Sequence, residues 1–418
     1  LYFILYLSKM IQIKRLSLII SIALGFTLFG NVFAADLGDN ITINAGDSNA
    51  KEQLANALCS SYSGSNVCSD NSARTITING IIDFNQNVAF QKVKGCVYSD
   101  NNCVDTKGAE QIIDRLGYCD NKKIIDVTIN PLGQDPLVVG SNKVIRGAGA
   151  NSGVKGRGFL LTGGVSNIII ENLSITDINE QVIWGGDAIT IDNASNVKID
   201  HNYIARIGRQ FIVTGWGPAT DISITNNNFD GTTGYGHYCD NRHYWNFLFY
   251  GAAQSISFQK NWVHNTSGRL PEVGQQDSVT GAGIVHVANN LFQSNFYMGA
   301  RTAPNVAIFL EGNDYDNVGT NIKTFNPIMK KNSNDPIFAP SIQNLNAANP
   351  ICNSYLGRNC FPNIFEDGQT YNTFTVDKSI FNYKFNVNVK NFVGGSAEYR
   401  LMDTKDVKNY VLNNAGPK

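Results

Sequence analysis

The chain of 418 residues carries 33 Lys and Arg against 34 Asp and Glu, so its formal net charge is −1. Because recognition of nucleic acid needs a concentrated basic surface, this balance argues against a nucleic-acid binder. Charged residues make up 16% and hydrophobic residues 43%, which excludes a disordered, highly charged chain. The 53 Asn and 39 Gly, which tolerate left-handed turns, favour a fold with many repeated turns over a helical bundle.

Residues 1–34 are interpreted as a secretory signal peptide with an extension upstream of Met10. Two basic residues precede an apolar run, and small residues place a cleavage site after Ala34. A membrane anchor is the alternative, because the apolar run is nearly long enough to span a bilayer, but the small-residue site favours cleavage. We expect a secreted protein, free of the membrane after cleavage, with one β-helix domain over residues 35–418.

Residues 50–57, just before the first cysteine, look helical. A short helix at the end of a repetitive β fold covers strand edges that would otherwise be unpaired. We expect this helix to cap the open end of the coil predicted below.

Eight cysteines behind a signal peptide predict disulfides formed in an oxidising compartment. They are Cys59, Cys68, Cys96, Cys103, Cys119, Cys239, Cys352 and Cys360. A zinc site is the competing interpretation, but no pair has CxxC spacing and no His cluster lies near the cysteines.

Six segments repeat one pattern of apolar residues. They begin at Asn167, Asn196, Asp221, Ser255, Ile284 and Ala307. Each has apolar residues at its second, fourth and ninth positions, as in Ile168, Ile170 and Ile175. Alternation gives strands with one buried face, and the irregular interval places length variation in loops between turns. The pattern predicts an all-β fold, a right-handed single-stranded parallel β-helix. Leucine-rich and propeller repeats fit less well, because the LxxLxL pattern and four strands per period are missing.

Five of these segments carry Asn at the seventh position. They are Asn202, Asn227, Asn261, Asn290 and Asn313. An Asn at this position can adopt a left-handed bend between two strands while its amide hydrogen-bonds the neighbouring coil. We therefore predict an asparagine ladder with a structural function.

Residues suited to catalysis concentrate in an ordered series of motifs between Trp184 and Val273. The motifs are Trp184-Gly185-Gly186-Asp187, Lys198-Ile199-Asp200-His201, Ala205-Arg206-Ile207-Gly208-Arg209-Gln210, His243-Tyr244-Trp245 and Ser267-Gly268-Arg269-Leu270-Pro271. The series closely resembles that of pectin lyases, in the pectate lyase superfamily of polysaccharide lyases. The resemblance covers about Cys96 to Tyr315 and resumes more weakly around Cys352 and Cys360.

The resemblance implies an endo-acting lyase that cleaves methyl-esterified homogalacturonan by β-elimination and releases unsaturated oligogalacturonides. A base removes the proton at C5 of a galacturonosyl unit, and the oxygen at C4 leaves. By position, Arg269 removes the proton, Arg209 stabilises the enolate that develops at C6, and Asp187 orients Arg209. An arginine base is unusual, because a guanidinium group normally keeps its proton.

Four further residues are expected to bind the substrate: Trp184, Trp245, Arg206 and Tyr244. Large aromatic side chains on the outer face of a β-helix can stack on sugar rings. The alternative is that the tryptophans are core aromatics and that the charged residues form an ordinary surface salt-bridge network.

The resemblance also implies that no metal is required. Calcium-dependent relatives carry acidic ligands at two positions after the Ile-Asp-His motif, where this chain has Arg209 and Val213. A fixed cation thus replaces the metal, so we expect no cofactor, no calcium requirement, and pectin as the partner of a monomeric enzyme. Lys198, Tyr98 and Tyr118 stand where well-known members have Trp, so affinity for long, fully esterified chains is expected to be reduced.

Two other functions stay open. One is a calcium-dependent pectate lyase, which sensitivity to a chelator would reveal. The other is a noncatalytic β-helix that binds polysaccharide at a cell surface, which would form no unsaturated uronide.

For the disulfides, the resemblance implies three pairs and leaves a fourth. The implied pairs are Cys96 with Cys119, Cys103 with Cys239, and Cys352 with Cys360. Cys59 and Cys68 remain and are expected to pair with each other.

Overall fold

The computed structural model describes residues 38–64, 66–98, 108–274, 283–302, 306–319, 325–330, 335–366, 374–382 and 400–418. Residues 1–34, the expected signal peptide, lie outside the described residues. Within the described part of the chain, no helix is both long and apolar enough to cross a membrane.

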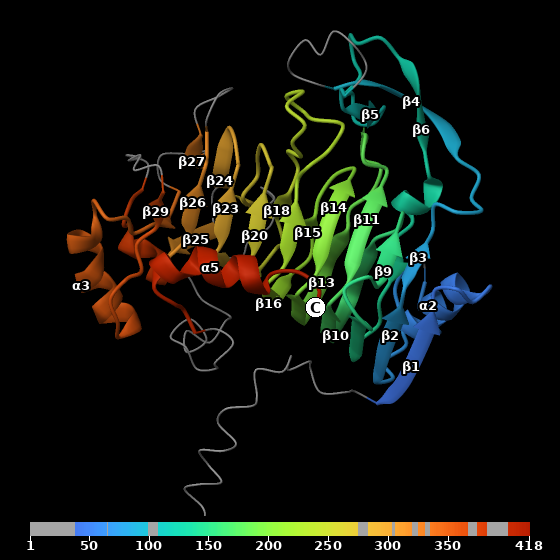
Figure 1. Cartoon of the computed structure of the whole chain (residues 1–418), viewed down its shortest axis with the longest axis horizontal. Coiled ribbons are helices and arrows are strands. Elements are labelled where there is room, and N and C mark those ends of the chain that lie inside the picture. The colour runs from blue at the N-terminus through green and yellow to red at the C-terminus, as the bar shows by residue number, and fades with distance from the viewer. Residues whose placement is uncertain are drawn as a thin grey trace, which may run out of the picture. The chain divides into compact units, whose positions relative to one another are not determined.

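Successive strands wind into three parallel sheets, named sheets 1, 2 and 3 (Figure 1). Sheet 1 contains β7 (Leu137–Val138), the first part of β10 (Phe159–Glu171), the first part of β13 (Ile189–Asp200), β15 (Ile212–Thr214), β18 (Phe247–Phe249), β21 (Glu272–Val273), β24 (Met298–Thr302) and β27 (Asn326–Lys330). Sheet 2 contains β1 (Asp39–Asn44), β2 (Arg74–Asn79), β8 (Lys143–Gly147), the last parts of β10 and β13, β16 (Ala219–Thr225), β19 (Gln254–Gln259), β22 (Gly283–Ala288), β25 (Val306–Glu311) and β28 (Ile337–Phe338).

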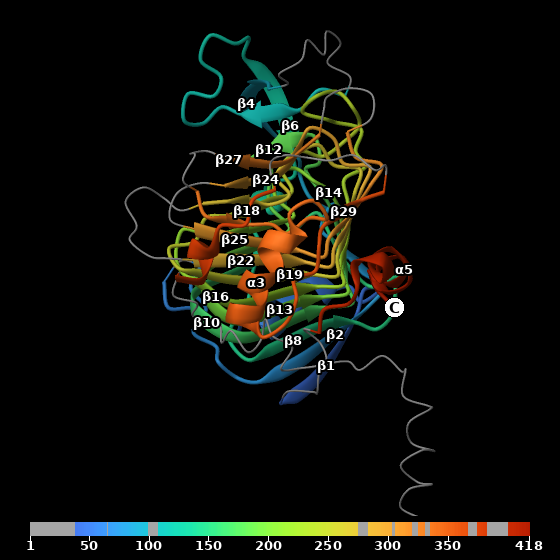
Figure 2. The ribbon, with the colours of Figure 1, turned by 90° about the vertical axis from the view of Figure 1, so that its left-hand side faces the viewer.

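Sheet 3 completes each coil. It contains β3 (Ile81–Asp83), β9 (Gly153–Lys155), β11 (Ser174–Ile178), β14 (Tyr203–Ile207), β17 (Asn228–Asp230), β20 (Trp262–His264), β23 (Leu291–Gln293), β26 (Asp314–Asp316) and β29 (Ile364–Phe365). Figure 2 shows the coils one behind another. The expected right-handed parallel β-helix is confirmed.

The apolar repeat forms the core between the three sheets. Ile168 pairs with Val197, which pairs with Ile222, and all three side chains are at most 2% exposed. The ninth positions pair in the same way on sheet 3, where Ile175 lies beside Ile204. Equivalent residues of successive coils therefore stack on one another, which is why the spacing predicted the fold.

The asparagine ladder is present and extends one step beyond its predicted end. Each ladder side chain after Asn202 accepts hydrogen bonds from the backbone N and the Nδ2 of the preceding ladder residue, at 2.8–3.1 Å. The last acceptor is Asn363, 50 residues after Asn313. The prediction was wrong about the backbone. From Asn202 to Asn313 the left-handed residue is the one before the ladder residue, such as His201 (φ 53°) and Lys260 (φ 57°), so the ladder asparagines themselves keep ordinary conformations.

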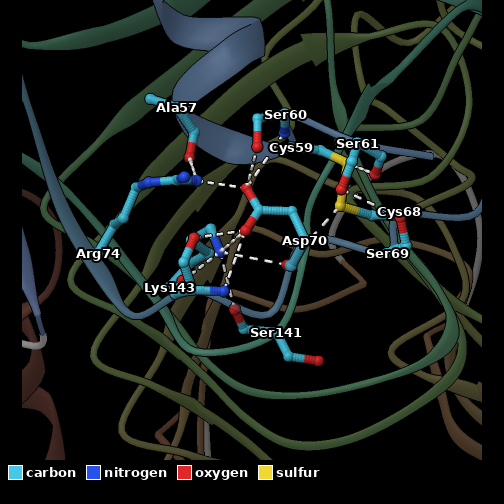
Figure 3. The surroundings of a disulfide bond; sticks show 11 residues. Ala57, Cys59, Ser60, Ser61, Cys68, Ser69, Asp70, Arg74, Ser141 and Lys143 are labelled. Atoms are coloured by element: carbon cyan, nitrogen blue, oxygen red, sulfur yellow. Dashed lines mark hydrogen bonds and ion pairs between the residues drawn. A yellow bond between two sulfur atoms is a disulfide. The ribbon is translucent and has the colours of Figure 1, made fainter.

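The helix α2 (Ala50–Leu58) covers the first coils, as expected. Its buried residues Ala50, Leu54, Ala57 and Leu58 join the main core. A disulfide between Cys59 and Cys68 follows directly (Figure 3).

Beside this disulfide lies a buried ion pair, Lys143 and Asp70 (Figure 3). The Lys143 ammonium, fully buried, donates to the carbonyl oxygens of Ser72 at 2.6 Å and Ser141 at 2.9 Å. Burial alone would raise the pKa of Asp70, but hydrogen bonds from Ser72 and Arg74 outweigh it and hold that pKa far below its usual range. Asp70 also pairs with Arg74 of β2, which donates to the carbonyl of Ala57 in α2 at 3.1 Å. The pair and Arg74 together therefore join α2, β2 and β8 at the capped end of the coil.

Three of the four expected disulfides are present: Cys59–Cys68, Cys96–Cys119 and Cys352–Cys360. Cys103 lies outside the described residues, so its pairing with Cys239 stays a prediction.

The Cys103–Cys239 bond would close the longest loop and should stabilise the fold most, by a few kcal/mol on the chain-entropy model. Peptide mapping without reduction tests it, and a link from Cys103 to any other partner would contradict it.

A fourth, small sheet packs beside one edge of sheet 1 (Figures 1 and 2). It consists of β4 (Gln91–Val97), β5 (Gln111–Ile113), β6 (Ile125–Ile129) and β12 (Val182–Ile183), and β4 runs antiparallel to β5 and β6. The 3₁₀ helix η1 (Pro131–Gln134) follows β6. Because β12 is followed directly by Trp184, this sheet holds the start of the first motif.

In the described parts of the chain, three further helical segments were not predicted from the sequence. The helix α3 (Leu345–Leu356) and the 3₁₀ helix η2 (Lys378–Asn382) cover the late strands of sheet 2 with apolar side chains. The helix α5 (Thr404–Asn414) lies across sheet 3, where Val407 and Val411 pack on Leu291 (Figure 1).

Near α5, the buried side chain of Asp314 should make stability depend on pH. Burial raises the pKa of Asp314 from 3.8 to about 7, and the charge of Glu366 acts in the same direction. The folded protein therefore binds this proton more tightly than the unfolded chain, so stability is present below pH 3.8 and is lost as pH rises through about 7.

Replacing Asp314 by asparagine should remove this loss. Since one pKa unit corresponds to about 1.4 kcal/mol, we expect a gain on the order of 2 kcal/mol at pH 8 and little change at pH 4. Denaturant unfolding at both pH values measures it. Asp126→Asn, which removes a remote ion pair with Lys94 at 2.8 Å, should bring no gain. Equal effects of Asp314→Asn at both pH values would contradict the assignment.

Candidate active site

The predicted catalytic residues come together at one edge of sheet 1. Ile189, Ile212 and Phe247 pair across neighbouring strands, and two residues before them stand Asp187, Gln210 and Trp245. On the next strand Glu272 pairs with Leu248, so Arg269 takes the equivalent place one coil further on. Neighbouring strands lie about 4.8 Å apart. Motifs that are up to 82 residues apart in the chain therefore form one row.

Arg209 is held between a carboxylate and an indole ring. Its Nη1 lies 3.8 Å from Oδ2 of Asp187, and its guanidinium carbon lies 3.8 Å from the ring centroid of Trp184. Asp187 in turn accepts a hydrogen bond from the backbone N of Gln210 at 2.8 Å. Burial raises the pKa of Asp187 and lowers the pKa of Arg209, while the charge of each partner acts in the opposite direction. The arrangement is a preorganised, largely dehydrated cation.

Glycine at position 186 allows this placement. Gly186 has φ 140°, and a Cβ atom there would collide with the carbonyl oxygen of Gly133. The Gly-Gly-Asp motif thus lets two backbones approach closely, and this places the side chain of Asp187 beside Arg209.

Arg269 is likewise held between a carboxylate and an indole ring. Its Nε lies 2.8 Å from Oε2 of Glu272, although the two groups are not aligned as a hydrogen bond. Its guanidinium carbon lies 4.5 Å from the ring centroid of Trp245 and 6.0 Å from that of Tyr244. The ring of Tyr244 packs against Gly268, where a side chain would collide with it, so the Ser-Gly-Arg motif also reflects close packing.

Three residues of the site had no predicted role. Gln210 is fully buried, and in the amide orientation that satisfies its neighbours it accepts from Nη1 of Arg269 at 2.9 Å and donates to the carbonyl of Trp245. His243 lies 2.6 Å from the carbonyl oxygen of Arg209, and burial lowers its pKa to about 4, so it is a neutral donor. Both residues stand inside the predicted motifs, which was the available signal.

Glu110, the third, had no signal in the sequence. It is 135 residues before Trp245, yet its carboxylate accepts from the Trp245 indole at 3.1 and 3.2 Å and contacts His237 at 3.2 Å. Burial raises the pKa of Glu110, while the hydrogen bond with His237 lowers it. Glu110 fixes the indole ring against which Arg269 rests.

Trp184 and Trp245 are half-buried, not fully exposed platforms. Tyr118 lies 6.2 Å from Trp184, and Tyr98 lies 6.3 Å from Trp245. The tyrosines noted as departures from the family thus complete one aromatic cluster with the two tryptophans, next to the Cys96–Cys119 disulfide. Tyr244, 9% exposed, packs edge-on against Trp245.

Arg206 is directed elsewhere. Its Nε and Nη2 donate to both carboxylate oxygens of Asp177 at 2.5 and 3.0 Å on sheet 3. Among the described residues its ion pair is with Asp177 and not with Asp187. Its expected role in substrate binding stays a prediction.

The donor set near Arg209 does not suit calcium. Val213 on β15 is apolar, and Arg209 places a permanent positive charge beside Asp187. Ca²⁺ prefers six to eight oxygen ligands. Within the described ranges, no group of three or more His, Cys, Asp or Glu side chains could hold a metal ion.

Comparison with solved structures concerns the fold. A pectate lyase from Bacillus sp. N165, solved in complex with trigalacturonate, has a TM-score of 0.51 with 17% identity and covers 93% of this chain and 97% of that one. A pectate lyase solved with a hexasaccharide has a TM-score of 0.50 with 18% identity over 90% of this chain and 91% of that one. Both support a pectate-lyase-like β-helix. No family model matches the chain.

Comparison with curated sequences is more specific. The chain is 41% identical over 251 residues to a probable pectin lyase F-1 of Aspergillus terreus, covering 60% of this chain and 64% of that protein. It is 43% identical over 215 residues to a probable pectin lyase E of Aspergillus fumigatus, covering 51% and 55%. The chain thus spans less than two thirds of the length of these relatives.

A third relative is matched over more of its length. The chain is 34% identical to pectin lyase D of Aspergillus niger over 299 residues, which are 71% of this chain and 74% of that protein. With this match, the chain belongs to the pectin lyase family.

Proposed function

We propose that the protein is a pectin lyase that cleaves methyl-esterified homogalacturonan by β-elimination. The observation that carries the proposal is the pair of guanidinium groups in neighbouring coils. Each rests on a tryptophan ring and each is paired with a carboxylate. Family membership supports the substrate class.

Before substrate reacts, Arg269 is a cation paired with Glu272. In this reaction it first releases a proton to water, and the neutral guanidine then accepts the proton from C5. The electrons of the C5–H bond form the C4–C5 double bond, the C4–O bond breaks, and the departing oxygen takes a proton from water. Negative charge develops on the C6 carbonyl oxygen in between. Arg209 stabilises that charge, and Asp187 keeps Arg209 in place.

The ester matters because of this developing charge. A free carboxylate would bring a second negative charge into the transition state, whereas a methyl ester is neutral. One arginine offsets about one unit of charge, so the site suits the ester without calcium. The second candidate is a calcium-dependent pectate lyase. Its only support is that a solved pectate lyase has a similar fold.

The remaining assignments belong to the same proposal. Trp184 and Trp245 position the guanidinium groups and present their exposed edges to sugar rings. Tyr244, packed against Trp245, supports this surface from below. We also propose that the enzyme is secreted, from the signal-like residues 10–34, and that it acts within the polymer chain as a monomer.

The product formed from pectins of graded esterification tests the proposal. Unsaturated product should form faster as methylation rises, and neither chelator nor added calcium should change the rate. A preference for unmethylated polygalacturonate that disappears with chelator would contradict the proposal and support a pectate lyase. Binding of polysaccharide without any unsaturated product would support the noncatalytic alternative.

A further inference from the structure

A carboxylate that the reaction scheme does not use lies between two arginines of sheet 1. Glu272, on β21, is 7% exposed. Its Oε2 lies 2.8 Å from Nε of Arg269, and its Oε1 lies 3.7 Å from Nη1 of Arg301. The hydroxyl of Tyr250 donates to Oε1 at 3.4 Å. Glu272 thus contacts the proposed base directly.

The sheet fixes this arrangement. Glu272 pairs in register with Leu248 on one side and with Arg301 of β24 on the other. The backbone N of Arg301 also donates to the carbonyl of Pro271 at 2.9 Å. Because both neighbours are held by backbone hydrogen bonds, the carboxylate sits at a defined distance from the reacting residues.

The charges of the site then nearly cancel. Arg209 is paired with Asp187, and Arg269 is paired with Glu272. Arg301 shares the Glu272 carboxylate with Arg269, so its own positive charge is only partly neutralised. Its side chain is 39% exposed and lies at the outer side of the row. A negative carboxylate beside Arg269 repels a substrate carboxylate in that position but not a neutral ester.

We propose that Glu272 is a specificity-determining residue, which sets the preference for esterified over free galacturonosyl units by neutralising Arg269 and Arg301. This inference rests on the proposed function. The negative charge of Glu272 disfavours a free uronate in the site. When that charge is removed, Arg301 is no longer neutralised and attracts a free uronate.

The variant Glu272→Gln keeps the shape of the side chain and removes its charge. The quantity to measure is kcat/KM on weakly methylated pectin divided by kcat/KM on highly methylated pectin. The ratio should rise about tenfold, given the strength of a charge interaction at this range. A purely structural defect would lower both constants together and leave the ratio unchanged, which would overturn the inference.

Two further variants complete the experiment. Arg301→Gln removes the cation that is left when Glu272 loses its charge, so the double variant should return the ratio toward wild type. Arg301→Gln alone should lower the ratio, and it tests the inference even if Glu272→Gln fails to fold. An unchanged ratio in Arg301→Gln would count against the inference.

The matched control is Glu366→Gln. It also removes a glutamate charge paired with a cation, Lys408 at 2.5 Å, but beside β29 of sheet 3 and not in the row of sheet 1. Its ratio should equal that of wild type, and a shift as large as that of Glu272→Gln would overturn the inference. Wild-type protein that forms no unsaturated product from any pectin would refute the proposed function instead, before the ratio is measured.

Discussion

Replacing Arg269 by lysine should lower turnover at least about a hundredfold while the protein keeps its fold, because a positioned general base contributes that much or more. Lysine keeps the charge but not the planar group. The guanidinium uses Nε toward Glu272, Nη1 toward Gln210 and its face toward Trp245. An ammonium group cannot satisfy these three directions at once.

Initial rates of unsaturated product and a thermal melt of the variant measure the two parts of this prediction. The matched control is Arg242→Lys, whose guanidinium also rests on an aromatic ring, at 3.7 Å from Phe296, outside the row of catalytic residues. It should keep most of its activity. Retention of more than about a tenth of wild-type activity by Arg269→Lys would mean that another group accepts the proton.

The sequence was sufficient for most of the fold because apolar spacing determines which residues face the core. The register of Ile168, Val197 and Ile222 follows directly from their equal place in the repeat. Asn363 was missed because 50 residues separate it from Asn313, far more than one repeat interval. The left-handed position was misplaced by one residue, because both the bend and the ladder favour asparagine and the sequence does not tell which residue does which.

For the site, as for the fold, local motifs could be predicted from the sequence and long-range contacts could not. Asp187, Arg209 and Arg269 stand in continuous motifs, so local sequence was enough to propose them. Glu110 acts on Trp245 from 135 residues away, and only the pairing of coils brings them together. Exposure was also beyond local sequence. The tryptophans were expected to be open platforms, but the small sheet packs against both rings and Glu110 holds that of Trp245, which makes them supports for the arginines as well.

Replacing Arg209 by glutamine should reduce kcat about 100- to 1000-fold, the usual cost of losing one group that stabilises developing negative charge. Glutamine keeps a planar polar head but loses the charge. Since the enolate exists only along the reaction path, the loss should fall on kcat, with KM changed by less than about threefold.

The position of Arg209 makes this expectation specific. The side chains of Arg209 and Asp187 are each 18% exposed, so little water can replace the lost charge, and Asp187 would be left without its cation. Arg206→Gln, three residues earlier, is the comparison: Arg206 pairs with Asp177 on sheet 3, so its loss should raise KM if it binds substrate and leave kcat nearly intact. Equal loss of kcat in both variants would show that the fold around β14 and β15 had been disturbed. A normal kcat in Arg209→Gln would mean that a different cation faces the enolate.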